Sequence, residues 1–274
     1  MITNSKLKIL ISTHKQFTFP ENDFYLPVHA GKKNSNINLN YQGDDIGDNI
    51  SDKNTSYCEL TTMYWAWKNL KELEYIGLCH YRRYFLFNKF LQHQLKRFNH
   101  NSSEFFALKG VLNVNDTIFK KFDFILSEPL RLGRTIYDDY ALYHNKLDFD
   151  VLGEVIQDLC SEYYISFTKL FYSSSQLSPY NMFVSSKKNF DCYCNWLFPI
   201  LFEVEKRIKI SEDIYQARVF GFMGERLLNL YIYHNQFKVK YIPVLKIDDE
   251  DNTQSMFYRQ LKYVVGSANN LINK

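Results

Sequence analysis

Two short apolar segments, far apart in this chain, each end abruptly in polar and basic residues. Residues 7–12 lead into residues 13–15, and residues 75–79 lead into residues 80–84. Segments with helical periodicity separate these and other strand-like segments. This alternation predicts an α/β fold: a single domain whose mostly parallel central sheet has an antiparallel edge and is flanked by helices. Ligands of such sheets bind beyond the carboxyl ends of the strands, so both polar segments are candidates for a binding site.

The other elements follow from the spacing of apolar residues. Apolar residues three and four positions apart predict helices, and short apolar runs predict strands. We expect Pro199 to kink or split the helix that contains it. The predicted helices cover residues 149–159, 190–208 and 221–233, and the further predicted strands cover residues 122–126, 180–184 and 239–245.

One more helix is predicted to begin at Ser56. Ser56 and Glu59 have the spacing of a capping box, in which each side chain satisfies a free backbone N–H group. Leu60, Tyr64 and Trp67 then recur on one helical face. Because capping already explains Glu59, we do not assign this residue to chemistry.

The composition is that of a soluble globular protein. Apolar residues make up 46% and charged residues 23% of the 274 residues, and a formal net charge of +3 does not by itself indicate nucleic acid as a partner. The five cysteines lack the spacing of a disulfide framework, so we expect a reduced, cytoplasmic protein. No signal peptide opens the chain, and the longest apolar run, 196–202, is too short to span a membrane. Only peripheral contact, at the inner face of the cytoplasmic membrane, is left open.

The strongest candidate site is the segment 80–84. Arg82 and Arg83 can donate paired, charge-assisted hydrogen bonds to phosphate oxygens, and His80 adds an imidazole. Two guanidinium groups at the end of a buried strand could neutralise the charge that develops on a pyrophosphate leaving group without a metal ion. The alternative is a surface cluster of ion pairs, or arginines packed over neighbouring phenylalanines.

Two weaker polar clusters could contact a donor nucleotide. The first cluster, Thr13, His14 and Lys15, follows a strand, where it would either contact phosphate or form a solvated loop. The second cluster, Asn49, Lys53 and Asn54, combines amides, a lysine and a helix N-terminus, which together suit an anion or a ribose.

Glu225 is the candidate general base. It follows two glycines at the expected start of a helix, and one positioned carboxylate is enough to deprotonate a sugar hydroxyl. The alternative is a structural role, in which Glu225 is favoured by the helix dipole in a first helical turn or pairs with Arg218 or Arg226. No D-x-D motif lies at a strand end, and the chain has neither a Walker A loop nor a G-x-G-x-x-G motif. We therefore favour a site without a metal, while Mn²⁺ or Mg²⁺ stays open.

Several segments together resemble a bacterial family of capsular polysaccharide and exopolysaccharide biosynthesis proteins, long catalogued as a domain of unknown function. The resemblance runs from about residue 7 to about residue 245 and is most specific over residues 57–85. It rests on segments 12–15, 47–54, 57–69, 76–85, 180–183 and 218–227.

The resemblance implies a glycosyltransferase domain with a GT-A-like fold over residues 1–250, followed by a C-terminal helical tail over residues 251–274. Known members include galactosyltransferases and galactofuranosyltransferases. The implied reaction is therefore transfer of a hexose from a UDP-sugar to a hydroxyl of a growing, lipid-linked glycan, and we favour inversion. In this fold the strand 75–79 occupies the place of the strand that carries D-x-D, and we infer that His80, Arg82 and Arg83 replace the metal. Asn181 and Met182 would lie on the acceptor side.

Two other classes of function stay open. The segment 80–84 could be a platform of arginines and aromatics that binds single-stranded RNA, although the low net charge and the lack of clustered lysines elsewhere disfavour nucleic acid. A non-catalytic glycan-binding module would use the same fold. The aromatic content of 17% supplies stacking faces for sugars or bases in each case.

Overall fold

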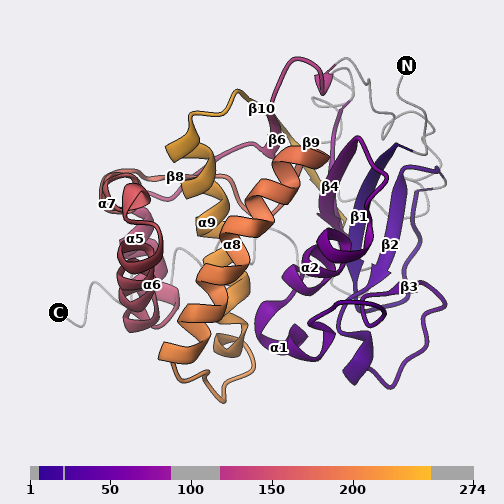
Figure 1. The fold of residues 1–274 in the computed structure, drawn as a ribbon, viewed down its shortest axis with the longest axis horizontal. Coiled ribbons are helices and arrows are strands. Elements are labelled where there is room, and N and C mark those ends of the chain that lie inside the picture. The colour runs from indigo at the N-terminus through magenta and orange to yellow at the C-terminus, as the bar shows by residue number, and fades with distance from the viewer. Residues whose placement is uncertain (1–5, 21, 88–117, 248–274) are drawn as a thin grey trace.

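The computed structural model describes residues 6–20, 22–87 and 118–247, which form one mixed β-sheet with helices packed against it (Figure 1). The strands lie in the order β10-β6-β9-β4-β1-β2-β3, with β5 paired to β4 and β11 paired to β5. The predicted helical tail over residues 251–274 lies outside the described residues. The strands are β1 Leu7–Thr13, β2 Tyr25–His29, β3 Gln42–Gly43, β4 Tyr75–His80, β5 Arg83–Phe85, β6 Phe124–Ser127, β9 Phe183–Ser186, β10 Val239–Ile242 and β11 Val244–Lys246, and a separate ribbon joins β7 Leu130–Arg131 to β8 Gln176–Leu177.

Parallel pairing joins β1 to β2 and β4, β2 to β3, and β6 to β10, as predicted. β9, however, runs antiparallel to both of its neighbours, β4 and β6, in the middle of the sheet. The expectation of antiparallel pairing at an edge is therefore wrong for β9, because a strand buried on both faces looks the same in sequence whichever way it runs. Phe183 at the start of β9 pairs with Leu78 near the end of β4. The segment before β9 thus lies beyond the carboxyl end of β4.

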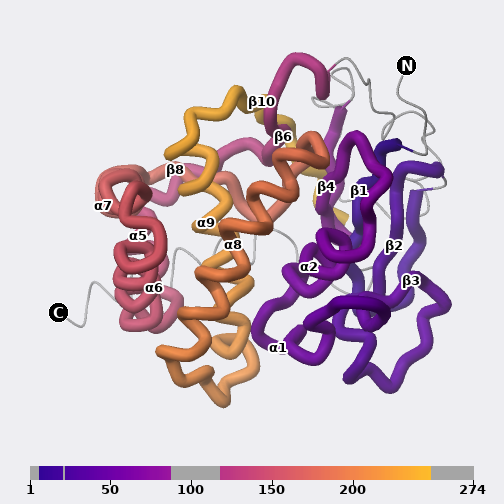
Figure 2. Tube along the Cα trace, in the orientation of Figure 1, coloured from indigo at the N-terminus to yellow at the C-terminus, as the bar shows by residue number. Residues whose placement is uncertain are grey.

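The helices form a layer on one face of the sheet. α8 and α9 lie at the centre, with α2 on one side of them and α5, α6 and α7 on the other (Figure 2). α8 continues through Pro199 as one helix, so the expected split does not occur. The helices are α1 Asn54–Tyr57, α2 Leu60–Asn69, α5 Ile136–Tyr143, α6 Lys146–Leu159, α7 Tyr164–Ser173, α8 Lys187–Arg207 and α9 Val219–Asn235.

The predicted helix at Ser56 is instead two helices that meet at an abrupt bend. Cys58, with φ 51° and ψ −129°, ends α1, and α2 begins two residues later. The capping box does not form: the Ser56 hydroxyl donates to the backbone oxygen of Lys53, and the Glu59 side chain makes no capping bond. The bend frees Glu59 for other contacts.

The sheet is buried on both faces. Leu10 packs under the helices, whereas Ile9 and Ile11 of the same strand pack on the opposite face, as period-two alternation requires. On that opposite face Tyr81 and Tyr84 are also buried, on either side of the arginines of segment 80–84. The core thereby anchors the turn that carries Arg82 and Arg83. Cys79 and Cys160 are buried free thiols, as predicted.

Across the described residues, no helix combines the length and apolarity needed to cross a bilayer.

Candidate active site

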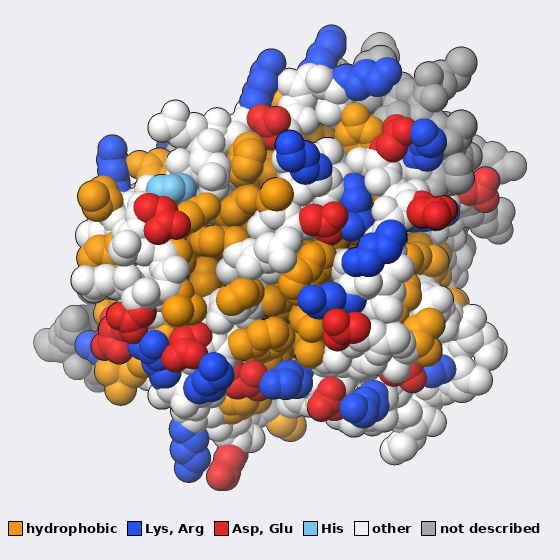
Figure 3. All heavy atoms as spheres, viewed as in Figure 1, with side chains coloured by type: hydrophobic (Ala, Val, Ile, Leu, Met, Phe, Trp, Pro, Cys, Tyr) orange, Lys and Arg blue, Asp and Glu red, His pale blue; other side chains and the backbone are white. Residues whose placement is uncertain are grey.

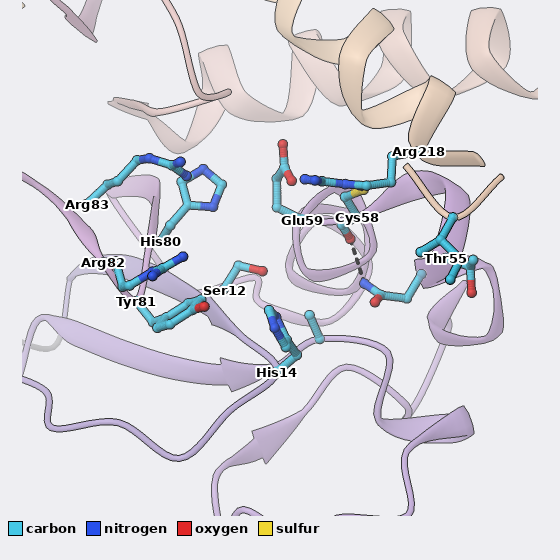
Figure 4. Close-up of a pocket in the computed structure, with 13 residues that line it drawn as sticks. Ser12, His14, Thr55, Cys58, Glu59, His80, Tyr81, Arg82, Arg83 and Arg218 are labelled. Atoms are coloured by element: carbon cyan, nitrogen blue, oxygen red, sulfur yellow. Dashed lines mark hydrogen bonds between the residues drawn. The ribbon is translucent and has the colours of Figure 1, made fainter. Parts of the chain in front are cut away.

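The carboxyl ends of β1 and β4 form one side of a cavity of about 430 Å³ (Figure 4). Ser12 and His80 are neighbours in the parallel register of these strands. The α1–α2 bend and the residue before α9 form the opposite side. The volume is in the range of sites for small organic ligands. The lining residues are Ser12, His14, Ala30, Asn54, Thr55, Cys58, Glu59, His80, Tyr81, Arg82, Arg83, Ile214 and Arg218.

Three arginines bring positive charge to this cavity. Arg82 comes from the β4–β5 turn, Arg83 begins β5, and Arg218 immediately precedes α9. The guanidinium carbon of Arg83 lies 4.6 Å from the ring centre of Tyr180, and that of Arg218 lies 5.6 Å from the ring centre of Phe222. The face of an aromatic ring attracts a guanidinium group. The N–H groups at the edge of that guanidinium can still donate to an anion.

Glu59 supplies the carboxylate of the lining. Its Oε1 accepts a 2.6 Å hydrogen bond from Nδ2 of Asn181, and the same Nδ2 donates at 3.1 Å to the backbone oxygen of Gly221. Asn181 therefore ties Glu59 to the first turn of α9. Figure 4 shows Glu59 between His80 on one side and Arg218 on the other. A carboxylate among cations can accept a proton from a ligand or pair with a cation, and the open cavity leaves room for a ligand.

The turn before β9 holds a strained backbone. Tyr180 and Asn181 have φ of 81° and 53°, a region that residues other than glycine rarely adopt. Glu225 Oε2 accepts a 2.5 Å hydrogen bond from the Tyr180 N–H, and His80 Nε2 donates at 2.6 Å to the Tyr180 carbonyl. These two side chains fix the turn and, through it, the position of the Asn181 amide.

The two histidines of the lining are held in the neutral form. Burial lowers the pKa of His80, and Arg83 lowers it further, while the Glu59 carboxylate and the bond to the Tyr180 carbonyl oppose the shift. Partial burial, with Lys15 and Arg82 nearby, also lowers the pKa of His14. At neutral pH the positive charge of the lining therefore comes from arginine and not from histidine.

Cys58 lines the cavity as an uncharged thiol. Burial, followed by the neighbouring Glu59 carboxylate, raises its pKa to about 11, against the opposing effect of Arg218. The Nε of Arg218 lies 3.3 Å from the sulfur. Because a nucleophilic cysteine needs a stable thiolate, these surroundings give no support to covalent chemistry at Cys58.

Two glycines let α9 approach the α1–α2 bend. A Cβ atom at Gly221 would lie 3.1 Å from the Cys58 sulfur, and one at Gly224 would lie 2.9 Å from Cδ1 of Leu60. Real Cβ contacts are rarely that short. The close approach allows the Gly221 carbonyl to reach the Asn181 amide.

The structure does not place Glu225 in the cavity lining. Its Oε2 accepts from the Tyr180 N–H, and its Oε1 accepts from Arg226 at 2.9 Å. It also lies in the second turn of α9 and not at its start. The position of Glu225 therefore gives no support to the predicted role of general base: its carboxylate holds the turn before β9, and the carboxylate that faces the cavity is that of Glu59.

Two residues predicted to bind the donor make other contacts, Lys53 with helix α8 and Asn49 within its own loop. Lys53 pairs with Glu205 at 2.6 Å, and Asn49 hydrogen-bonds to the backbone of Asp45, Gly47 and Ser51 within its own loop. Neither lines the cavity. Polar residues in a loop satisfy their own backbone as readily as they bind a ligand, and the sequence pattern does not separate the two uses.

Three more predicted residues fall outside the lining. Thr13 is buried and its hydroxyl donates to the Lys15 carbonyl, while the Lys15 side chain is exposed. Met182 is fully buried on the sheet face opposite the helices, away from the cavity. Its neighbour Asn181 lies in the turn before β9, and its side-chain amide contacts Glu59 and the Gly221 carbonyl instead.

The predicted residues that do line the cavity are His14, Asn54, His80, Arg82 and Arg83. Sequence reasoning missed Glu59 because the capping pattern explained it, and it assigned no role to Cys58. It named Arg218 only as a possible partner of Glu225. The proximity of Arg218 to Glu59 in the fold could not be read from residues 159 positions apart.

The lining chemistry does not fit a divalent cation. Hard cations prefer several oxygen ligands, and the lining offers one carboxylate facing three arginines. Over the part of the chain that the structure describes, no group of three or more His, Cys, Asp or Glu side chains is arranged to hold a metal ion.

A comparison with protein-family models matches residues 8–236 to the domain of unknown function DUF4422. This chain belongs to that family. The match covers the strands, the α1–α2 bend and the start of α9, so every residue of the cavity lining lies within the DUF4422 domain. A search of curated proteins finds no match.

Among solved structures, this DUF4422 domain is similar to the apo structure of WbbM, a bifunctional glycosyltransferase. The TM-score is 0.80 and the sequence identity is 32%, over 89% of this chain and 46% of the WbbM chain. The chain thus spans less than half the length of that protein. The similarity confirms the predicted Rossmann-like fold, with a mostly parallel central sheet flanked by helices.

Proposed function

We propose that this protein is a glycosyltransferase that transfers a hexose from a UDP-sugar to a hydroxyl of a growing glycan. The observation that carries the proposal is the placement of Arg82, Arg83 and Arg218 around one cavity at the carboxyl ends of β1 and β4. Support also comes from the similarity to WbbM, described as a bifunctional glycosyltransferase, which covers nearly the whole of this chain.

The arginines would bind the donor diphosphate and stabilise its departure. As the bond between the anomeric carbon and the diphosphate oxygen breaks, negative charge grows on that oxygen. Fixed guanidinium groups stabilise such charge without having to reorganise. We therefore propose that Arg82, Arg83 and Arg218 do the work that a bound metal does in enzymes carrying a D-x-D motif.

Glu59 would act as the general base. The acceptor hydroxyl attacks the anomeric carbon, the bond to the diphosphate breaks, and Glu59 accepts the hydroxyl proton. Such a single displacement inverts the configuration at that carbon. Asn181 orients the carboxylate by its 2.6 Å bond, which leaves Glu59 Oε2 to face the acceptor.

His80 takes a different role from the one that the sequence predicts. Its Nε2–H is already donated to the Tyr180 carbonyl, and its lowered pKa keeps the ring neutral. We propose that His80 positions the turn that carries Asn181 and does not neutralise phosphate. His14 and Asn54, which both line the cavity, stay candidates for contact with the nucleotide.

The acceptor and the cellular setting are proposals that extend the family resemblance. We propose that the acceptor is a lipid-linked glycan, that the enzyme works in the cytoplasm, and that it contacts the inner face of the membrane peripherally. A metal-independent reaction predicts that full activity survives EDTA, whereas a strict requirement for Mn²⁺ or Mg²⁺ would show that the arginines do not replace a metal.

A melting scan tests the proposed function. A ligand at 100 times its dissociation constant stabilises the native state by about 2.7 kcal/mol, which gives a clear rise in melting temperature. We expect this rise with UDP and a smaller one with GDP. Release of UDP from a panel of UDP-hexoses, measured with a glycan acceptor, then reports turnover. No rise with any nucleoside diphosphate would contradict the proposal.

The RNA-binding alternative predicts a broad basic surface, and the distribution of charged side chains does not favour it. Figure 3 shows Lys and Arg side chains interspersed with Asp and Glu over one face of the molecule. Several are paired, including Lys53 with Glu205 and Arg207 with Asp158. A glycan-binding module without catalysis would bind saccharide but show no melting shift with UDP, so the same scan separates it from a transferase.

A further inference from the structure

A second cavity, of about 520 Å³, lies among α7, α9, β8 and β10. The two helices each contribute a pair of residues one turn apart: Lys169 and Ser173 from α7, and Asn229 and Tyr233 from α9. Residues at i and i+4 share one helical face, so each pair faces the cavity together. The volume again suits a small organic ligand.

Two half-exposed tyrosines set the character of this cavity. Tyr233 is 39% exposed and Tyr241 is 44% exposed, both large aromatic side chains that are only partly covered. Tyr241 is the register partner of the buried Leu126, so both side chains project from the helix-covered face of the sheet. Aromatic faces of this kind pack against the apolar faces of sugar rings.

Four polar groups around the tyrosines are unused, whereas Ser178 and Asn229 of the same lining are hydrogen-bonded to each other and to the backbone. Within the residues described here, the hydroxyls of Ser173, Tyr233 and Tyr241 and the side-chain amide of Gln176 make no hydrogen bond to the protein. These groups both donate and accept, which is what a sugar hydroxyl requires of its partners. The lining holds one charged side chain, Lys169, and no carboxylate. The chemistry fits an uncharged, hydroxyl-rich ligand.

The second cavity is joined to the first by one short segment and one helix. Ser178 lines the second cavity, and Asn181, three residues later, holds Glu59 in the first. Arg218 immediately precedes α9 and Tyr233 lies near its end, and at 1.5 Å per residue these positions are about 22 Å apart. That separation fits an extended oligosaccharide and not a single sugar.

We propose that the second cavity binds the saccharide chain of the acceptor, several sugar units behind the hydroxyl that reacts at Glu59. The proposal rests on the proposed function, since it names a second contact for the acceptor of that reaction. Binding a growing chain at two points holds its end at the first cavity at high effective concentration. It therefore predicts that longer acceptors bind more tightly than short ones.

The test is a titration of the full chain with a pool of neutral hexasaccharides prepared from galactan, glucan and mannan, followed by saturation-transfer NMR. We expect binding of at least one component, weakened about fivefold by Tyr233→Ala or by Tyr241→Ala, the scale of a lost aromatic contact. Tyr233→Phe, which keeps the ring, should bind more tightly than Tyr233→Ala. Tyr164→Ala is the matched control, because Tyr164 is 38% exposed on α7 and lines neither cavity.

Several results would overturn the assignment. They are the absence of any hexasaccharide binding, equal weakening by Tyr164→Ala, and displacement of the hexasaccharide by UDP, which would place it in the first cavity. The melting shift with UDP is recorded on the same variants and should not change. Its absence in the unaltered protein would contradict the proposed function, whatever the saccharide result.

Discussion

Glu59 lies in surroundings that keep its carboxylate oriented toward the first cavity. It faces the first cavity beside Arg218 and accepts a hydrogen bond from Asn181, whose own position depends on the strained turn before β9. Strain of this kind persists when surrounding contacts determine it, and it collects at functional sites. Here those contacts are the hydrogen bonds that His80 and Glu225 make to the backbone of Tyr180.

The first prediction concerns the carboxylate itself. Glu59→Gln keeps the shape and removes the basic oxygen, so we expect kcat to fall about 100-fold or more, the usual effect of losing a general base. UDP binding, measured by the melting shift, should persist, because a neutral amide leaves the three arginines in place. Unchanged kcat would exclude Glu59 as the base.

Glu225→Gln is the matched control. An amide at this position presents either an oxygen or an NH₂ group to the Tyr180 N–H and loses the ion pair with Arg226. We expect a fall of about 1–3 kcal/mol in the free energy of unfolding, because buried polar groups lose their partners. Activity should fall only as far as the turn is displaced. A loss of kcat as large as that of Glu59→Gln, in a protein of unaltered stability, would restore Glu225 as the base.

The second prediction concerns the arginines of the β4–β5 turn. Arg82→Ala and Arg83→Ala should each lower kcat/KM by about 10-fold to 100-fold, the effect of losing a charge-assisted hydrogen bond to phosphate. The melting temperature without ligand should change little, since the flanking Tyr81 and Tyr84 anchor the turn. Arg131→Ala, an exposed arginine of β7, is the control and should leave both quantities unchanged. Parallel losses of stability and activity would make Arg82 and Arg83 structural.

At the scale of elements, the first cavity depends on how closely α9 packs on the α1–α2 bend. The contact is possible because Gly221 and Gly224 carry no side chain at the point of approach. Arg218, just before α9, and Glu59, just before α2, are brought together by this contact and not by the sheet. The glycines therefore set the width of the cavity.

The third prediction tests that packing. Gly224→Ala places a Cβ atom 2.9 Å from Leu60, so we expect the free energy of unfolding to fall by about 1–2 kcal/mol, an overpacking cost partly offset by better helix propensity. The affinity for UDP should also fall, because α9 carries Arg218. Adding Leu60→Ala should remove much of the steric contribution to this loss of stability. A double-mutant cycle measures that contribution as the coupling energy between the two substitutions. Strict additivity of the two changes would show that this contact is not the cause.

A pH-dependent contact also belongs to α9. His144, just after α5, stacks on Phe222 of α9 with ring centres 3.9 Å apart, and burial followed by the charge of Arg226 lowers its pKa to about 4. The pKa of this histidine is lower in the folded state than its unfolded value of about 6.5. The neutral ring therefore contributes stability at pH values above about 6.5, and that contribution is lost as the pH falls toward 4.

The fourth prediction follows from this sign. Between pH 6.5 and pH 4 the melting temperature of the unaltered protein should fall more than that of His144→Phe, which keeps the stacked ring and cannot be protonated. Differential scanning calorimetry across this range measures the difference. Identical slopes for the two proteins would show that His144 does not titrate with folding.

At the scale of the whole molecule, the sequence predicts the sheet better than it predicts the site. Short apolar segments that end in polar residues identify β1 and β4, and with them the edge of the sheet where Arg82 and Arg83 lie. This pattern can be recognised because it involves only residues adjacent in the sequence. The direction of β9 depends on contacts with distant strands, since a strand buried on both faces looks the same in sequence whichever way it runs. The reversal of β9 is what brings Asn181 to the site.

The remaining site residues depend on contacts between distant segments. Glu59 satisfies a local capping pattern, and only the left-handed backbone at Cys58 shows that the cap does not form. Glu225 has the right chemistry for a base, but its carboxylate is used by Tyr180, 45 positions earlier. Sequence reasoning ranks residues by type, whereas the fold determines which of them face an open volume.

The proposed mechanism requires one arrangement: a nucleoside diphosphate held by arginine in the first cavity. A crystal structure of the protein with UDP bound tests this most directly. We predict that diphosphate oxygens lie within hydrogen-bond distance of the guanidinium groups of Arg82 or Arg83, with Glu59 open to the acceptor side. UDP bound away from these arginines, or bound through a metal ion held by other residues, would contradict it.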